Sequence, residues 1–147
     1  MYPSGDLVSF RGAPGALRRT PIKEFARTLR DAVARGREFH CLITDDRELR
    51  RLNRRFLGHN YPTDVLSFPS DGKDALGDLA ISAGRAAEQA RALGHSQLDE
   101  IRILMLHGVL HLVGMDHEID GGRMARAETR WRKKLNLPPG LIARARS

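Results

Sequence analysis

Three histidines fall within eleven residues, in the run HGVLHLVGMDH at positions 107 to 117. His107 and His111 are four residues apart, and at about 3.6 residues per helical turn both imidazoles lie on one helix face. Gly114 can adopt a positive φ and reverse the chain, which would return His117 towards the first two rings. Three protein ligands with one open position are typical of catalytic zinc. The run therefore predicts a metal site formed by His107, His111 and His117.

The apolar neighbours of these histidines leave a structural alternative open. A single histidine among leucines is most often a core residue whose ring is hydrogen-bonded. Three of the six histidines within eleven residues, with a glycine at the turn, favour the metal site instead. Asp116 directly precedes the third histidine. Either it orients a ligand ring or accepts a proton, or it stabilises a turn or helix cap.

The same run can be compared with HExxHxxGxxH, the extended zinc-peptidase signature. The histidines and the glycine have the same spacing here, but Gly108 stands where the signature has glutamate. In the peptidases that glutamate is the general base that activates the metal-bound water. Since glycine has no side chain to transfer a proton, peptide hydrolysis by that route is not expected.

The charge of the chain indicates a polyanionic substrate for such a metal. Lys and Arg number 25 against 18 Asp and Glu, and the net charge of +7 attracts polyanions. A metal ion lowers the pKa of bound water and neutralises charge on a phosphoryl oxygen, so cleavage of phosphodiester bonds suits it. One predicted helix carries five arginines, which form either a solvated face or a groove wall that neutralises RNA phosphates. These candidate RNA contacts are Arg47, Arg50, Arg51, Arg54 and Arg55.

Hydrophobic spacing and turn residues predict the elements that position these side chains. The helix that carries the histidines is mostly apolar around its second half, which indicates a central, buried position. Prolines at 62 and 69 confine a short strand to a sheet edge or to a brief pairing. Helices are expected at about 20–36, 46–56, 83–93, 97–113 and 122–135, and strands at about 8–11, 38–44, 65–68 and 75–82. The predicted fold class is α+β, with a small mixed sheet of about four strands, about five helices and a zincin-like, His-rich central helix.

Three helix starts carry recognisable signals. Thr20 followed by Pro21 is typical of an N-cap with proline at the first helical position. Asp45 or Asp46 is expected to cap the second helix, and Ser82 the third. In the second helix Leu49, Leu52 and Phe56 form the apolar stripe.

Length and composition indicate one domain, residues 1–147, with 41% hydrophobic residues for a core. No run reaches the about 18 to 20 apolar residues that span a bilayer, and the start lacks the pattern of a secretory signal. Cys41 is the only cysteine, which excludes an intrachain disulfide. We expect a cytoplasmic protein without a membrane partner.

Beyond the histidine run, further blocks occur in a characteristic order. They are LNRRF (52–56), PTDVLSFP (62–69), LGDLAIS (76–82) and GHS (94–96). With HGVLHLVGMDH, which resembles the pattern HGxLHLxGxDH, they make the chain similar to the YbeY family of bacterial rRNA maturation factors and endoribonucleases. The resemblance runs from about residue 38 to 135.

This resemblance implies a single-strand-specific endoribonuclease, a metal-dependent hydrolase that matures the 3′ end of 16S rRNA and serves ribosome quality control. The implied cofactor is one zinc ion or another divalent metal, on His107, His111 and His117. The implied partners are single-stranded RNA, 16S rRNA, the small ribosomal subunit and ribosome-associated factors. Many members place an arginine where this chain has Leu57. Either Arg54 or Arg55 substitutes, or the site handles phosphate differently.

Two rival functions and four further residues complete the expectations. The chain could instead be an RNA- or ribosome-binding assembly factor whose metal only stabilises the fold, or, less favoured, a metallopeptidase. Asp64 and Asp78 flank predicted strands, where turn roles are the default and proximity to the metal is the alternative. His59 and His95 lie in predicted loops, where an exposed histidine usually has no special role, although His95 is a candidate substrate contact.

Overall fold

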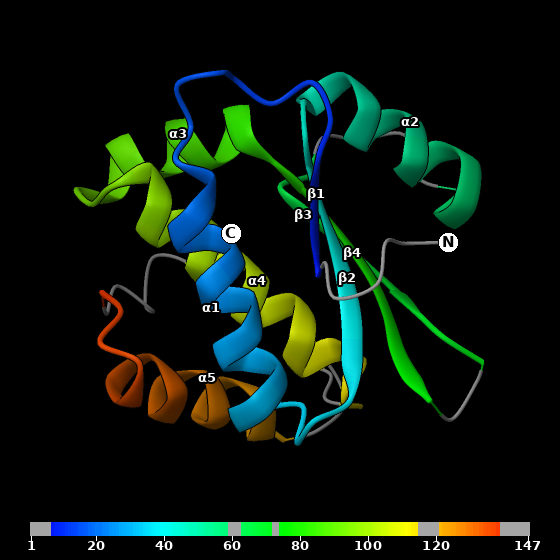
Figure 1. The fold of residues 1–147 in the computed structure, drawn as a ribbon, viewed down its shortest axis with the longest axis vertical. Coiled ribbons are helices and arrows are strands. Elements are labelled where there is room, and N and C mark those ends of the chain that lie inside the picture. Colours follow the sequence, from blue (N-terminus) through cyan, green and yellow to red (C-terminus); the bar gives the residue numbers. More distant parts are fainter. Residues whose placement is uncertain (1–6, 59–62, 72–73, 115–120, 139–147) are drawn as a thin grey trace.

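Four strands form one mixed sheet in the order β1-β2-β4-β3 (Figure 1). The computed structural model describes residues 7–58, 63–71, 74–114 and 121–138. The β1-β2 and β2-β4 pairs are parallel, and β3 pairs antiparallel with β4 at an edge of the sheet, one of the two positions that its prolines allow. The strands are β1 (Val8–Phe10), β2 (Glu38–Thr44), β3 (Val65–Pro69) and β4 (Ala75–Ser82).

Helices cover the two faces of this sheet unequally. The helix α4 packs on β3 and β4, and α1, α3 and α5 pack against α4, whereas α2 lies on the opposite face of the sheet (Figure 1). The helices are α1 (Arg19–Ala32), α2 (Asp46–Leu57), α3 (Ala83–Leu93), α4 (Gln97–Leu112) and α5 (Arg123–Lys134). Five helices and four strands in the described part of the chain confirm the α+β prediction. None of the helices in these described ranges is long and apolar enough to cross a membrane.

The core is centred on α4, as its apolar composition predicted. Ile101, Met105 and Leu106 are fully buried there, between the sheet and the other helices. A helix that is hydrophobic on nearly all sides needs cover on nearly all sides. The polar residues of α4 therefore stand out, because burying an imidazole or a carboxylate costs free energy unless it finds a partner.

The caps confirm two of the three predicted helix starts. The Asp45 carboxylate accepts a hydrogen bond from the backbone N–H of Glu48 at 2.8 Å, and the Ser82 hydroxyl accepts one from the backbone N–H of Arg85 at 3.1 Å. The prediction for α1 is wrong, because its N-cap is Arg18 and makes no side-chain cap. Thr20 and Pro21 lie within the first turn, where proline is tolerated since no N–H there has an intrahelical partner.

The apolar stripe of α2 emerges gradually from the protein. Leu49 is fully buried against Leu66 and Ala80 of the sheet, Leu52 is half-buried, and Phe56 is 60% exposed. This gradient shows that the C-terminal end of α2 stands away from the sheet. Phe56 thus belongs to the predicted apolar stripe by helical spacing but is mostly exposed.

Candidate functional site

His107 and His111 lie side by side on α4, as their spacing predicted. The ring centroids are 4.8 Å apart and the ring planes meet at 74°. Both side chains are partly exposed, so the face that carries them is open to solvent in a helix that is otherwise mostly buried. The arrangement places two imidazoles where one small ion could contact both.

A buried carboxylate stands behind the first ring. Nδ1 of His107 forms a hydrogen bond with Oε1 of Glu128, whose side chain is only 4% exposed. Such a carboxylate fixes the tautomer and the orientation of an imidazole, and leaves Nε2 directed elsewhere as a ligand. Carboxylate–histidine pairs of this kind are usual behind metal-binding histidines. Glu128 therefore positions the His107 ring, a role that the spacing of the histidines does not predict.

The sequence did contain a signal for Glu128. On α5 it lies four residues after Met124 and directly after Ala127, and both of these are buried. A carboxylate on the buried face of an amphipathic helix is rare without a partner. The pattern could have marked Glu128 as half of a polar pair, although the identity of the other half depends on how α5 packs against α4.

Gly108 lies where α4 touches the sheet most closely. A Cβ atom built on Gly108 would be 2.5 Å from Cδ2 and 3.1 Å from Cδ1 of Leu79, whose side chain is buried. The hydroxyl of Ser67 on β3 also points to this place, 3.5 Å from the Gly108 carbonyl oxygen. Close packing against Leu79 thus favours glycine at this position, and glycine cannot act as a base.

The other predicted ligands differ in how far the structure tests them. Gly114 has φ of +102°, the positive value expected at this turn, but His117 and Asp116 lie outside the described residues. Within 7–58, 63–71, 74–114 and 121–138, no three His, Cys, Asp or Glu side chains come together as a metal-binding group. The roles of His117 and Asp116 therefore stay predictions.

The two aspartates that flank strands have other surroundings. Asp64 accepts a hydrogen bond from Nε2 of Gln89 at 2.6 Å, and its carbonyl accepts one from the Ser82 backbone, so it fixes the start of β3 to α3. Asp78 lies on β4 and lines a pocket on the α2 side of the sheet, away from the face where Leu79 meets α4. Both positions favour roles other than metal binding.

His95 is not an exposed loop residue. Its Nε2 lies 2.6 Å from Oε1 of Glu100, and the two side chains are 10% and 0% exposed. This pair satisfies a carboxylate in the first turns of α4 and fixes the α3–α4 connection. The expectation of a solvent-exposed His95 is thus wrong, while His59 lies outside the described residues.

The donor atoms that are present suit a transition-metal ion. Imidazole nitrogen is a preferred ligand of zinc, nickel, copper and iron. The one thiol is not available, because Cys41 is fully buried and burial raises the pKa of its thiol far above the usual range. His107 and His111, with Glu128 behind them, therefore fit two of the three ligands of the predicted site.

We expect Glu128→Ala to lower metal affinity about 10- to 100-fold, the usual effect of removing a partner behind a ligand histidine. The measurement is competition for the metal with a chromophoric chelator. Glu128→Gln keeps an oxygen that accepts from Nδ1 and should recover part of the affinity. Glu88→Gln removes a carboxylate from an exposed position on α3 and should change nothing. Unchanged metal affinity in Glu128→Ala would leave Glu128 with only a structural role.

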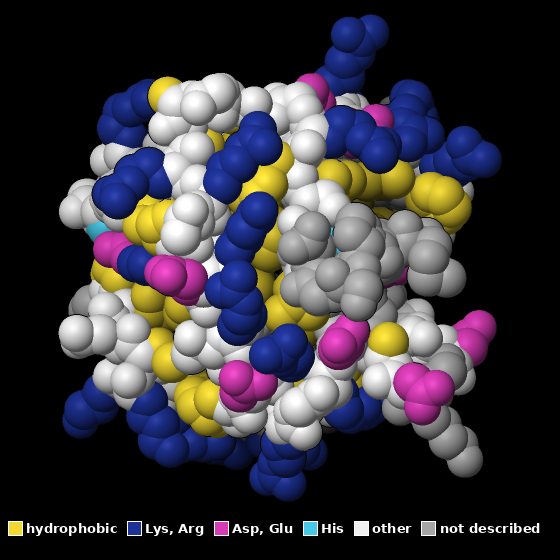
Figure 2. Space-filling view, in the orientation of Figure 1, with side chains coloured by type: hydrophobic (Ala, Val, Ile, Leu, Met, Phe, Trp, Pro, Cys, Tyr) yellow, Lys and Arg dark blue, Asp and Glu magenta, His cyan; other side chains and the backbone are white. Residues whose placement is uncertain are grey.

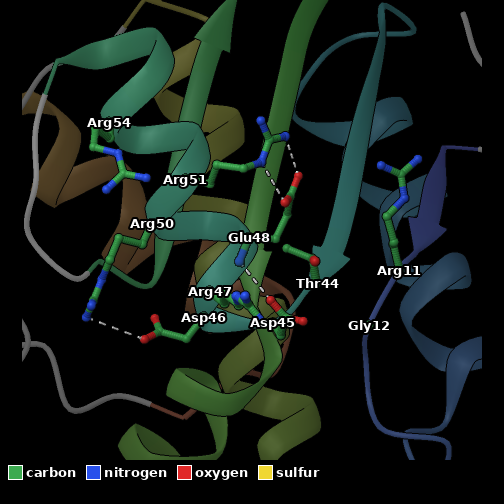
Figure 3. A pocket seen from close by; sticks show the side chains of 10 residues that line it. All are labelled: Arg11, Gly12, Thr44, Asp45, Asp46, Arg47, Glu48, Arg50, Arg51 and Arg54. Atoms are coloured by element: carbon green, nitrogen blue, oxygen red, sulfur yellow. Dashed lines mark hydrogen bonds and ion pairs between the residues drawn. The ribbon is translucent and has the colours of Figure 1, made fainter.

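A second feature is a basic hollow along the N-terminal half of α2. It has a volume of about 600 Å³, and Arg11 lies across it from the helix (Figure 3). Figure 2 shows Lys and Arg side chains gathered over α2, at the upper right, although others cover α1 and α5. The hollow is lined by Arg11, Gly12, Thr44, Asp45, Asp46, Arg47, Glu48, Arg50, Arg51 and Arg54.

The five candidate arginines of α2 are not equivalent. Arg51 donates two hydrogen bonds to Glu48, at 2.8 and 2.7 Å, and hydrogen bonding to Arg51 is the main cause that lowers the pKa of the Glu48 carboxyl. Arg50 lies 4.0 Å from Asp46. By contrast, Arg47 and Arg54 form no salt bridge with another described residue. These two have most of their donors available for a phosphate.

Arg55 does not line the hollow. Its guanidinium carbon lies 5.4 Å from the centre of the Phe56 ring, at the exposed end of α2. The structure therefore brings four of the five candidate arginines to the hollow and places the fifth beside an exposed aromatic ring.

Comparison with known proteins identifies the family. The profile of the family described as Endoribonuclease YbeY matches residues 17–136. A protein of Solibacter usitatus named Endoribonuclease YbeY is 62% identical over 145 residues, which cover 99% of this chain and 98% of that protein. One of the same name from Koribacter versatilis is 51% identical over 118 residues, with 80% and 77% covered.

A solved structure shows the same fold. The solution structure of TM1509 from Thermotoga maritima superposes with a TM-score of 0.60 at 24% sequence identity, and the match covers 84% of this chain and 85% of that one. Full-length identity and a matching profile over most of the sequence agree with the motif blocks and the two adjacent imidazoles. The chain belongs to the Endoribonuclease YbeY family.

Proposed function

We propose that this protein is a metal-dependent endoribonuclease that cleaves single-stranded RNA. The observation that carries the proposal is the pair of imidazoles on α4 with the buried carboxylate of Glu128 behind His107. Family membership supports the same reaction, since the relatives are named endoribonucleases. His107, His111 and His117 would hold one zinc ion or another divalent metal, and Asp116 would orient a ligand or accept a proton.

Each group of residues has a separate task in this proposal. When bound, the metal would lower the pKa of water and neutralise charge on a phosphoryl oxygen. Glu128 holds the His107 ring in one tautomer and one orientation, so that the ring does not reorganise when substrate arrives. The arginines of α2 and Arg11 neutralise the phosphates of the strand and set its position.

The biological substrate that we propose is 16S rRNA, at its 3′ end, with a further part in ribosome quality control. The small ribosomal subunit and ribosome-associated factors would be the partners, and the cytoplasm the location. We also propose that residues 1–147 form a single domain, which agrees with a profile match that covers 17–136. Resemblance to the family supports each of these points.

Metal removal separates an enzyme from an assembly factor with a structural metal. We expect a chelator to abolish cleavage of a single-stranded RNA while the circular dichroism spectrum stays that of the folded chain, because the core around α4 does not include the histidine face. Re-addition of zinc should restore cleavage. Unfolding on chelation, with no cleavage by the holoprotein, would favour the assembly factor instead.

The phosphate contacts can be tested by the salt dependence of RNA affinity. We expect Arg54→Ala to weaken binding and to reduce the slope of log K against log salt by about 1, because one phosphate contact is lost. Arg91→Ala on α3 is the matched control, since it removes the same charge from an exposed position away from the hollow. Equal changes in RNA affinity and salt slope for the two variants would show that the arginine face of α2 is an ordinary solvated surface.

A further inference from the structure

A second pocket, of about 460 Å³, lies between the exposed end of α2 and the sheet. Leu52 and Phe56 of α2 form one wall of the pocket, and residues of the strands form its floor. This size falls within the range of small-molecule and cofactor pockets. Its lining includes Arg11, which also lines the basic hollow, so the two cavities share a rim.

The floor of this pocket is mostly apolar, with a few polar side chains. His40, Asp78 and Phe68 are Cα partners across β2, β4 and β3, and Leu42 and Ala80 form the next row. The Ser9 hydroxyl lies 2.7 Å from Nε2 of His40. A nucleobase has the same division, with two apolar faces and an edge of hydrogen-bond donors and acceptors.

The wall of the pocket provides an aromatic surface. Phe56 is 60% exposed, and its ring packs edge-on against Phe68 with the ring centres 6.1 Å apart. Contact with Phe68 holds the ring while its remaining surface stays accessible. Stacking on exposed aromatic rings beside cationic side chains is the common way in which proteins bind unpaired bases.

Arginines around the pocket favour an anionic occupant, although its floor also includes Asp78. Arg54 and Arg55 directly precede Phe56, and Arg11 lies at the rim that the pocket shares with the hollow. A nucleotide whose base enters the pocket would have arginines on both sides, where they can hold the two phosphates that flank it. A duplex does not fit, because its bases are already stacked and paired inside the helix.

We propose that this pocket receives an unpaired base of single-stranded RNA, stacked on Phe56, while Arg11 and the α2 arginines hold the adjacent phosphates. The proposal deepens the proposed endoribonuclease function and rests on it for the identity of the polymer. It also explains single-strand preference by a contact that only an unpaired base can make.

The pocket and the histidine pair lie on opposite faces of the sheet, joined by the edge strand β3. Phe68 lines the pocket, whereas the preceding Ser67 reaches the α4 backbone at Gly108. A single-stranded RNA that occupies both the pocket and the histidine pair must therefore pass around the edge of the sheet at β3. The pocket would therefore bind a nucleotide at a distance from the scissile bond and set which bond reaches the metal.

The test compares two fluorescein-labelled 2′-O-methyl oligonucleotides that resist cleavage, one with its bases and one abasic throughout. By fluorescence anisotropy, we expect the native protein to prefer the first about 10-fold. Phe56→Ala should lose this preference by weakening only the base-containing ligand, and Phe56→Trp should keep it. Because Phe56 is mostly exposed, the alanine variant is expected to keep the native melting temperature.

Leu57→Ala is the matched control, since Leu57 is the adjacent exposed apolar residue, at 41%, and does not line the pocket. It should keep the preference for bases. The same preference in Phe56→Ala as in the native protein would overturn the pocket proposal, even if RNA is cleaved. Conversely, base-dependent binding without any cleavage would overturn the proposed function and leave the pocket in place.

Discussion

Replacing His107 by alanine is expected to lower the rate of RNA cleavage about 1,000-fold or more, because a metal ion contributes several kcal/mol to such a reaction. RNA affinity should change little, since the α2 arginines lie on the other face of the sheet. The measurements are single-turnover cleavage of a labelled single-stranded RNA, anisotropy, and metal content of the purified variant.

Two further sets of variants test whether His107→Ala disturbs folding and whether His107 and His111 act together. His107→Ala leaves the buried Glu128 without its imidazole, so His107→Gln, which retains an amide donor for Glu128, separates lost metal from lost stability. His111→Ala should reduce cleavage by a similar factor, and the double variant should be no worse than either one, because the two residues act as a unit. Full activity of His107→Ala with no bound metal would refute the site.

Introducing the glutamate of the peptidase signature, Gly108→Glu, is expected to cause the largest loss of stability among the variants proposed. Its Cβ would lie 2.5 Å from Cδ2 of Leu79, a side chain that is only 1% exposed, so the two groups must shift apart within the core. Overpacking alone costs about 1–3 kcal/mol, and burying a carboxylate without a partner adds to this. Against a total stability of about 5–15 kcal/mol the loss is severe. Urea denaturation measures it, and we expect no peptidase activity.

Two alanine variants separate the contact with Leu79 from the general effect of removing a helical glycine. Gly108→Ala should destabilise by about 1–3 kcal/mol, partly offset by about 1 kcal/mol of better helix propensity. Gly84→Ala on α3 meets nothing closer than 4.0 Å, so it should be neutral or slightly stabilising. If Gly108→Glu were as stable as the native chain and hydrolysed casein, the metallopeptidase alternative would regain support.

Local patterns were enough for most elements and for the imidazole pair, although α1 ends at Ala32 and not near the predicted 36. The strands 38–44 and 75–82 begin and end where predicted, and α4 ends one residue before the predicted 113. Asp45 and Ser82 act as caps because a capping bond depends only on residues three positions apart. The adjacency of His107 and His111 follows in the same way from the helical repeat.

Contacts between distant segments could not be read from these local rules. Glu128 meets His107 across 21 residues, and Ser9 meets His40 across 31. Such partners depend on how α5 packs on α4 and how β1 pairs with β2. The same holds for Phe56, where helical spacing placed the ring on the apolar stripe but could not show that α2 departs from the sheet.

The sequence by itself determined which residues have the chemistry for a metal, which helix carries two of them and which charge the substrate should have. Tertiary structure alone decided that Glu128 stands behind His107, that Leu79 leaves little space for a side chain at Gly108, and that an aromatic pocket opens beside the arginines. The physical reason is that backbone periodicity and capping act over a few residues. Burial and hydrogen bonding, by contrast, depend on which faces of the sheet and helices meet.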